Sequence, residues 1–137
     1  MKILFVCKYN RFRSKIAEAF FNKYNKNPKN EAKSAGPIEG QAISPEILEV
    51  AKKNNLELTS KPQGLSSALL VWQDLTIVVA DNVPKELFNE QAKYGKKTEF
   101  WDISDSQSDK IEEMQPIVKS IELKVKDLIN RLEDIKA

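Results

Sequence analysis

The stretch that decides the fold runs from Lys2 to Ser14 and reads KILFVCKYNRFRS. Its first five residues, KILFV, are rich in β-branched and aromatic side chains and show no alternating polarity, which is typical of a central parallel strand buried on both faces. After a short loop, apolar side chains recur at helical spacing from Ile16 to Tyr24. The chain therefore opens with a strand, a loop and a helix.

The rest of the chain alternates between strand and helix patterns. Further strands are predicted at Glu31–Ala35, Leu75–Ala80 and Thr98–Trp101. Further helices are predicted after Ser44, over Ser66–Trp72, and from Ile111 onward. In the first of these, Ser44 is the N-cap and Pro45 takes the first helical position.

The last predicted helix has apolar residues in alternating steps of three and four, a spacing that also suits a coiled-coil seam. Strands that alternate with helices need a helix to cover the sheet, so core packing is favoured. We expect one α/β domain over residues 1–137. Its sheet should have four parallel strands in the order 2-1-3-4, with helices on both faces and the ligand loop at the carboxyl ends of the strands.

Composition narrows the possible functions. Hydrophobic residues make up 41% and charged residues 31% of the 137 residues, which is ordinary for a globular protein. The net charge of +2 gives no reason to expect a nucleic-acid partner. Apolar stretches such as Ile3–Cys7 are far shorter than the roughly 20 residues that cross a bilayer, and too short for a signal peptide. We therefore expect no membrane partner and a cytoplasmic location.

The chain has one cysteine and no histidine. An internal disulfide is therefore impossible, and Ser-His and Cys-His catalysis are excluded. The same counts argue against a zinc site, since histidine and cysteine are its usual ligands. We expect no metal and no cofactor, and any proton transfer falls to a carboxylic acid.

The loop between the first strand and the first helix carries the chemistry. Successive backbone N–H groups in such a loop point inward, and the positive end of the helix dipole strengthens their attraction for an anion such as phosphate. The same field stabilises a thiolate, which makes Cys7 a candidate nucleophile. The planar fork of Arg13 can hold two phosphoryl oxygens, and the Ser14 hydroxyl can donate to the thiolate. Otherwise Cys7 is a small hydrophobe that ends a strand, and Ser14 is a helix N-cap.

Lys8 and Arg11 add positive charge to this loop, which attracts phosphate substrates if the side chains face the cleft and is ordinary solvated surface if they do not. The predicted phosphate-binding residues are Lys8, Tyr9, Asn10, Arg11, Phe12, Arg13 and Ser14.

With these residues in place, the whole chain resembles the low-molecular-weight protein tyrosine phosphatase family, whose signature is Cys, five residues, then Arg-Ser. Cys7, Asn10, Arg13 and Ser14 match the family's loop, Ser34-Ala35-Gly36 matches its Ser-Ala-Gly segment, and Asp81 matches a recurring acid. The resemblance implies a flavodoxin-like three-layer sandwich. It also implies a relation to thioredoxin-coupled arsenate reductases.

The family's general acid is an Asp in an Asp-Pro pair before the last helix. Asp105 is the best match here, with Ser106 in place of the proline, and Asp102 and Asp109 are the alternatives. Two more positions depart from the family: Tyr9 stands where glycine is usual, and Phe12 where a second cysteine is common. A bulky Tyr9 tolerates a positive φ poorly, so a strained or altered loop path is expected.

These observations predict a phosphate monoester hydrolase of the protein tyrosine phosphatase type that works through a phosphocysteine. The catalytic residues are then Cys7, Arg13 and Asp105, the partner is a phosphorylated protein or a small phosphate monoester, and inorganic phosphate is the product. One alternative is an arsenate reductase that uses an external thiol, because the chain has no additional cysteine. Another is a non-catalytic module that binds phosphorylated ligands. Phosphotyrosine, phosphoarginine and metabolite substrates all remain open.

Overall fold

The computed structural model describes residues 1–39, 42–58, 60–93 and 95–136. A parallel sheet lies at its centre, with its strands in the order β2-β1-β3-β4. The strands are β1 Lys2–Val6, β2 Glu31–Ala35, β3 Leu75–Val78 and β4 Lys97–Phe100. The order expected from the sequence is confirmed, and the carboxyl ends of all four strands meet at one edge.

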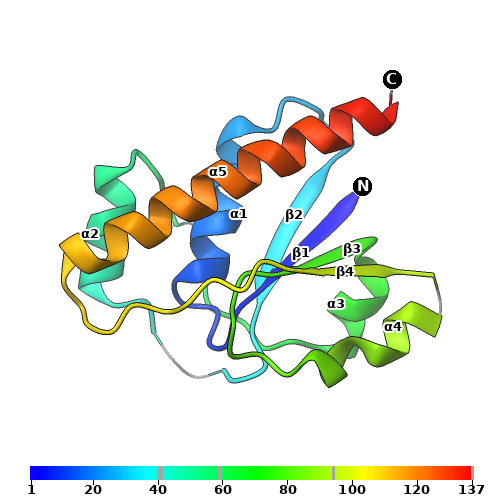
Figure 1. Cartoon of the computed structure of the whole chain (residues 1–137), viewed down its shortest axis with the longest axis horizontal. Coiled ribbons are helices and arrows are strands. Elements are labelled where there is room, and N and C mark those ends of the chain that lie inside the picture. Colours follow the sequence, from blue (N-terminus) through cyan, green and yellow to red (C-terminus); the bar gives the residue numbers. More distant parts are fainter. Residues whose placement is uncertain (40–41, 59, 94, 137) are drawn as a thin grey trace.

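Helices cover both faces of this sheet. They are α1 Arg13–Tyr24, α2 Pro45–Lys53, α3 Ser67–Trp72, α4 Asn89–Lys93, α5 Ile111–Lys136 and the short 3₁₀ helix η1 Lys85–Phe88. In Figure 1, α1, α2 and α5 lie on one side of the strands, and α3 and α4 lie on the other. The three-layer arrangement is the flavodoxin-like sandwich that the resemblance implied.

Two apolar clusters fill the spaces between the layers. Because side chains along a strand alternate between faces, Ile3 and Phe5 of β1 join the cluster under α1 and α5, whereas Leu4 and Val6 join the cluster under α3. All four are fully buried. The absence of alternating polarity in this strand therefore reflects burial on both faces.

Several boundaries differ from the sequence-based expectation. The third strand ends at Val78, two residues early, and the fourth is shifted by one residue to Lys97–Phe100. Helix α1 begins at Arg13 with Phe12 as its N-cap and no side-chain cap, so the N-cap alternative for Ser14 is wrong. Ser44 does cap α2, because its Oγ accepts the Ile47 N–H at 3.2 Å. The sequence reasoning did not identify η1 and α4.

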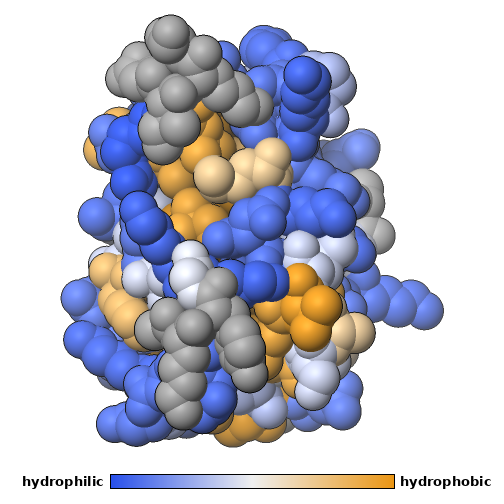
Figure 2. Space-filling model, turned by 90° about the vertical axis from the view of Figure 1, so that its right-hand side faces the viewer, coloured by the Kyte–Doolittle hydropathy of each residue, from blue (hydrophilic) through white to orange (hydrophobic). Residues whose placement is uncertain are grey.

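The face shown in Figure 2 is mainly hydrophilic, with hydrophobic side chains gathered in separate patches. Within the described ranges, no helix combines the length and the apolar character that a membrane span requires.

Candidate active site

The loop from Cys7 to Phe12 joins β1 to α1 at the carboxyl edge of the sheet. Its one residue with a positive φ is Asn10, at 53°, a left-handed conformation that asparagine tolerates better than most residues. Tyr9 does not have a positive φ. Of the two expectations for Tyr9, the strained backbone angle is therefore wrong, because the sharp bend falls on its neighbour; the altered loop path stays a prediction.

Two side chains of this loop and one from the first turn of α1 form a buried hydrogen-bonded group. Cys7 Sγ lies 2.9 Å from Ser14 Oγ and accepts the Ser14 backbone N–H at 3.3 Å. Asn10 Nδ2 donates to Ser14 Oγ at 2.7 Å. Because the Ser14 oxygen accepts from Asn10, its hydroxyl hydrogen is free to donate to the sulfur. This arrangement suits a thiolate at Cys7.

The orientation of the Asn10 amide is fixed from the other side. Its Oδ1 accepts the backbone N–H of Gln63 at 2.9 Å, so the oxygen faces Gln63 and the nitrogen must face Ser14. Asn10 is fully buried, and both ends of its amide are paired. The amide therefore links the loop to a segment that lies 53 residues further along the chain.

Arg13 is the largest fully buried side chain of the described residues. Its guanidinium donates to the Ile103 carbonyl at 2.8 Å and to Asn82 Oδ1 at 3.1 Å. Carboxylate oxygens of Asp81 and Asp105 each lie 3.7 Å from one of its terminal nitrogens. The loops that follow β3 and β4 thus orient the guanidinium of a residue at the start of α1.

The candidate acids occupy different places. Asp105 is half-buried, lies beside Arg13, and accepts the Ser106 N–H through Oδ1 at 2.9 Å. Asp81 lies near the other terminal nitrogen of Arg13 and accepts the Ser104 hydroxyl at 2.6 Å. Asp102 and Asp109 are exposed, and neither has a described contact with Arg13. Of the three alternatives for the general acid, only Asp105 is brought to the guanidinium.

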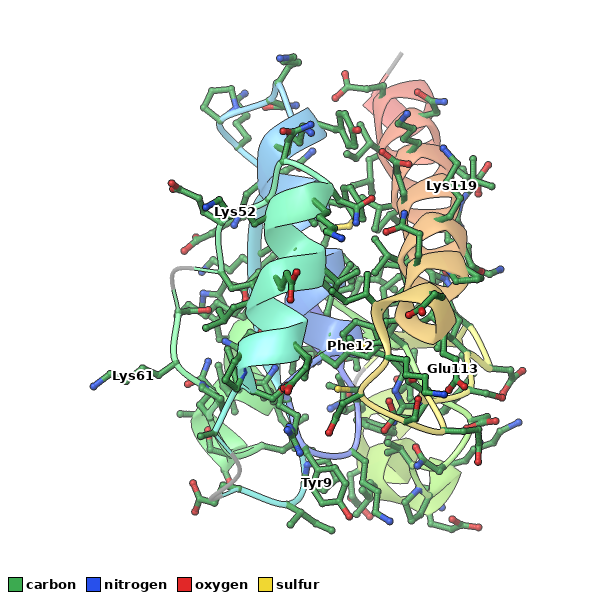
Figure 3. The ribbon with its side chains drawn as sticks, turned by 90° about the vertical axis from the view of Figure 1, so that its left-hand side faces the viewer. Tyr9, Phe12, Lys52, Lys61, Glu113 and Lys119 are labelled. Carbon is green, nitrogen blue, oxygen red and sulfur yellow. The ribbon has the colours of Figure 1, made fainter. Side chains whose placement is uncertain are left out.

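A cavity of about 300 Å³ opens beside the loop. One part of its wall is apolar and the other polar. The lining residues are Tyr9, Arg11, Phe12, Ile47, Asp105, Ser106, Gln107, Ser108, Asp109 and Met114. Figure 3 shows Tyr9 at the outer end of the loop and Phe12 between α1 and the start of α5. Lys8 places its ammonium 5.3 Å from the Tyr9 ring and does not line the cavity.

Gly36, which follows β2, packs directly against the loop. A Cβ built on this residue would lie 2.7 Å from Cys7 O, 2.8 Å from Asn10 N and 2.9 Å from Lys8 O. All three are backbone atoms, so the loop leaves no room for a side chain here. Within the predicted Ser34-Ala35-Gly36 segment, Gly36 therefore has a steric role beside the loop.

A family model described as low molecular weight phosphotyrosine protein phosphatase matches residues 2–137. The chain belongs to this phosphatase family. One curated relative is the low molecular weight protein-tyrosine-phosphatase PtpB of Staphylococcus haemolyticus, which is 31% identical over 96 residues, or 70% of this chain and 69% of that protein.

Two solved structures have folds similar to that of this member of the phosphatase family. A protein tyrosine phosphatase of Entamoeba histolytica, with Hepes in its active site, has a TM-score of 0.85 and 25% identity, covering 100% of this chain and 99% of that one. The YwlE arginine phosphatase of Geobacillus stearothermophilus has a TM-score of 0.85 and 22% identity, covering 98% and 94%. The second likeness establishes the fold only.

Sequence reasoning missed Asn82, Gln63 and the Ile103 carbonyl. Asn82 follows the acid Asp81 after a strongly predicted strand, so its position at the carboxyl edge of the phosphatase sheet was a usable signal. Gln63 lies in a loop with no strand or helix pattern, and a backbone carbonyl such as that of Ile103 leaves no trace in residue identity. Neither of these two could be found without the fold.

Proposed function

We propose that this chain hydrolyses phosphate monoesters through a phosphocysteine formed on Cys7. The observation that carries the proposal is the grouping of three residues at one strand–loop–helix junction: Cys7, Ser14 with its hydroxyl 2.9 Å from the sulfur, and Arg13, the buried first residue of α1. A helix N-terminus favours bound phosphate and a thiolate alike. Attack on phosphorus by a stabilised thiolate is the chemistry that this combination supports.

In the first step the Cys7 thiolate attacks phosphorus, the bond between phosphorus and the ester oxygen breaks, and protonated Asp105 transfers its proton to that oxygen. In the second step the Asp105 carboxylate takes a proton from water. The water oxygen attacks phosphorus, the phosphorus–sulfur bond breaks, and inorganic phosphate leaves. The Ser14 hydroxyl stabilises the returning thiolate.

Arg13 supplies the charge that the transition state needs. Its fork can hold two phosphoryl oxygens while their negative charge redistributes, and it costs little reorganisation because Ile103 and Asn82 already orient it. A lysine offers a single point charge and lacks this geometry.

The substrate class proposed is an aryl phosphate of the phosphotyrosine type, on a protein or a small molecule. Phe12, Ile47 and Met114 form an apolar wall of the cavity beside the loop, and Asp105 lines the same cavity. An aromatic leaving group can pack on that wall with its ester oxygen directed to the acid.

The test is hydrolysis of two aryl phosphates by wild type and three variants. Cys7→Ser should abolish turnover while phosphate or vanadate binding persists, because an unassisted serine hydroxyl is not ionised. Arg13→Lys should lose about 10²-fold in rate. Asp105→Asn should slow phenyl phosphate more than nitrophenyl phosphate, since only the poorer leaving group needs the proton.

Each outcome has a defined consequence. Undiminished turnover in Cys7→Ser removes the mechanism, and equal slowing of both substrates in Asp105→Asn removes Asp105 from the acid role. If wild type hydrolyses neither ester but consumes thiol with arsenate, a reductase replaces the phosphatase. Binding of phosphate without either reaction would leave a binding module.

A further inference from the structure

Lys15 is a buried charge next to the catalytic loop. It occupies the first turn of α1, directly after Ser14, and only 1% of its surface is exposed. Lysine is almost never buried unless it is paired, and a cation in the first turn opposes the helix dipole. An apolar side chain would satisfy packing at this position at lower cost. The charge therefore needs an explanation other than packing.

The Lys15 ammonium is held by the segment that precedes Gln63. It donates to Ser60 Oγ at 2.6 Å and to the Lys61 carbonyl at 2.9 Å, and it lies 3.7 Å from Glu18 Oε1. Ser60 also donates to Glu18 at 3.0 Å. In Figure 3 the Lys61 side chain extends away from the protein, so its backbone alone takes part in this contact.

The same segment makes several contacts around the catalytic loop. The Gln63 N–H donates to Asn10 Oδ1 at 2.9 Å, and its side-chain amide donates to the Ser34 carbonyl at 2.9 Å. Its own carbonyl accepts the Gly36 N–H at 3.1 Å. Gln63 thus fastens the segment to the end of β2 and to Asn10, and Lys15 fastens the start of the same segment to α1.

We propose that Lys15 is a positioning residue for the nucleophile. Its ammonium anchors Ser60 and Lys61, the anchored segment presents the Gln63 N–H to Asn10, and Asn10 then directs the Ser14 hydroxyl to Cys7. This inference rests on the proposed function, because the direction of the Ser14 hydroxyl matters to catalysis only if Cys7 attacks phosphate.

Electrostatics agrees with this arrangement. Burial lowers the pKa of Lys15, whereas the charges of Glu18 and of the Cys7 thiolate raise it. The pairing with Glu18 therefore offsets part of the cost of burying the Lys15 ammonium.

The test compares Lys15→Met, which removes the charge and the donors at similar length, with Lys23→Met as the matched control. Lys23 lies on the same helix but is exposed. Lys15→Arg is the rescue variant, because it keeps both charge and donors. Ser60→Ala removes one acceptor from an exposed position, where loss of folding is not expected.

The first readout is hydrogen exchange of the Gln63 backbone amide. In Lys15→Met it should exchange about tenfold faster than in wild type, since the segment that holds it is released. The Val79 amide, which donates to Val6 O at 2.7 Å directly after the end of β3, should be unchanged. The second readout is kcat and KM for nitrophenyl phosphate. We expect kcat to fall about tenfold or more and KM to stay near wild type, because Lys15 is not among the residues that line the cavity beside the loop.

Restored kcat in Lys15→Arg, and a smaller loss in Ser60→Ala, support the proposal. It is overturned if Lys15→Met keeps both the Gln63 protection and the kcat of Lys23→Met. If Lys15→Met does not fold, Ser60→Ala decides: wild-type exchange and kcat in that variant overturn the proposal. If wild type hydrolyses no phosphate ester, the proposed function fails, while faster Gln63 exchange in Lys15→Met still supports the anchoring.

Discussion

Replacement of Gly36 by alanine tests how tightly the end of β2 supports the proposed catalytic loop. The new Cβ would meet three backbone atoms of the loop at 2.7 to 2.9 Å, whereas ordinary contact begins at 3.4 Å. The loop and the strand end must therefore separate by about 0.5 to 0.7 Å. Backbone atoms cannot yield by rotating a side chain, so the displacement passes to Cys7 and Asn10.

Two magnitudes follow from that displacement. Overpacking of this kind costs about 1–3 kcal/mol of the free energy of unfolding. A shift of about 1 Å in a catalytic group costs about 10²-fold in rate, so we expect kcat/KM to fall by about tenfold to a hundredfold. Urea unfolding measures the first quantity, and steady-state hydrolysis of nitrophenyl phosphate measures the second.

Gly95→Ala is the matched control. Its φ of +74° makes alanine strained, but an added Cβ meets no described atom within 4 Å. It should lose about 1 kcal/mol of stability and no activity. If Gly36→Ala retains the kcat/KM of wild type, the steric argument is wrong. The steric argument is also wrong if Gly36→Ala and Gly95→Ala lose equal activity.

Three further substitutions test the scaffold by urea unfolding. Leu128→Ala should cost about 2–5 kcal/mol, because a side chain that is 1% exposed leaves a cavity. Tyr24→Phe should cost about 1 kcal/mol of the free energy of unfolding, because its hydrogen bond to Glu122 is lost. This hydrogen bond raises the pKa of Tyr24, so its contribution to stability is present below the ordinary tyrosine pKa and is lost as pH rises through the raised pKa. Arg131→Gln should cost about 0.5 kcal/mol of the free energy of unfolding at neutral pH, because the ion pair with Glu99 is lost. Hydrogen bonds from Arg131 lower the pKa of Glu99, so this cost should shrink as pH falls through the lowered pKa. If the cost of Tyr24→Phe or of Arg131→Gln does not change with pH, the pKa argument for that substitution is wrong.

The sheet could be read from the sequence because its strands are buried on both faces. Lys2–Val6 and the strand at Leu75 are mainly apolar and show no alternating polarity, a pattern that predicts both their type and their central position. The edge strand Lys97–Phe100 is half-buried and carries charged residues, and its boundary was wrong by one residue. Helix α4 has five residues and falls in a polar stretch, where periodicity gives no signal.

The site was predictable to the extent that its residues are contiguous. Cys7, Asn10 and Ser14 lie within eight positions, and a strand–loop–helix pattern brings them together. The orientation of Arg13 depends on the Ile103 carbonyl, a backbone group 90 residues away. Every residue has such a carbonyl, so the sequence does not indicate which one will meet the guanidinium. The burial of Lys15 was likewise invisible, since a lysine beside an arginine in a first turn is ordinarily solvent-exposed.

The parallel sheet has a consequence for the order in which the chain folds and becomes active. The loops after β1, β2, β3 and β4 supply Cys7, Gly36, Asn82 and Ile103 respectively, so every strand contributes one contact to the site. Such contacts between distant segments form only after loop-closure entropy has been overcome, and they come late in folding. A nascent or partly unfolded chain therefore lacks these contacts around Cys7, and the proposed site is assembled only when the tertiary structure is complete.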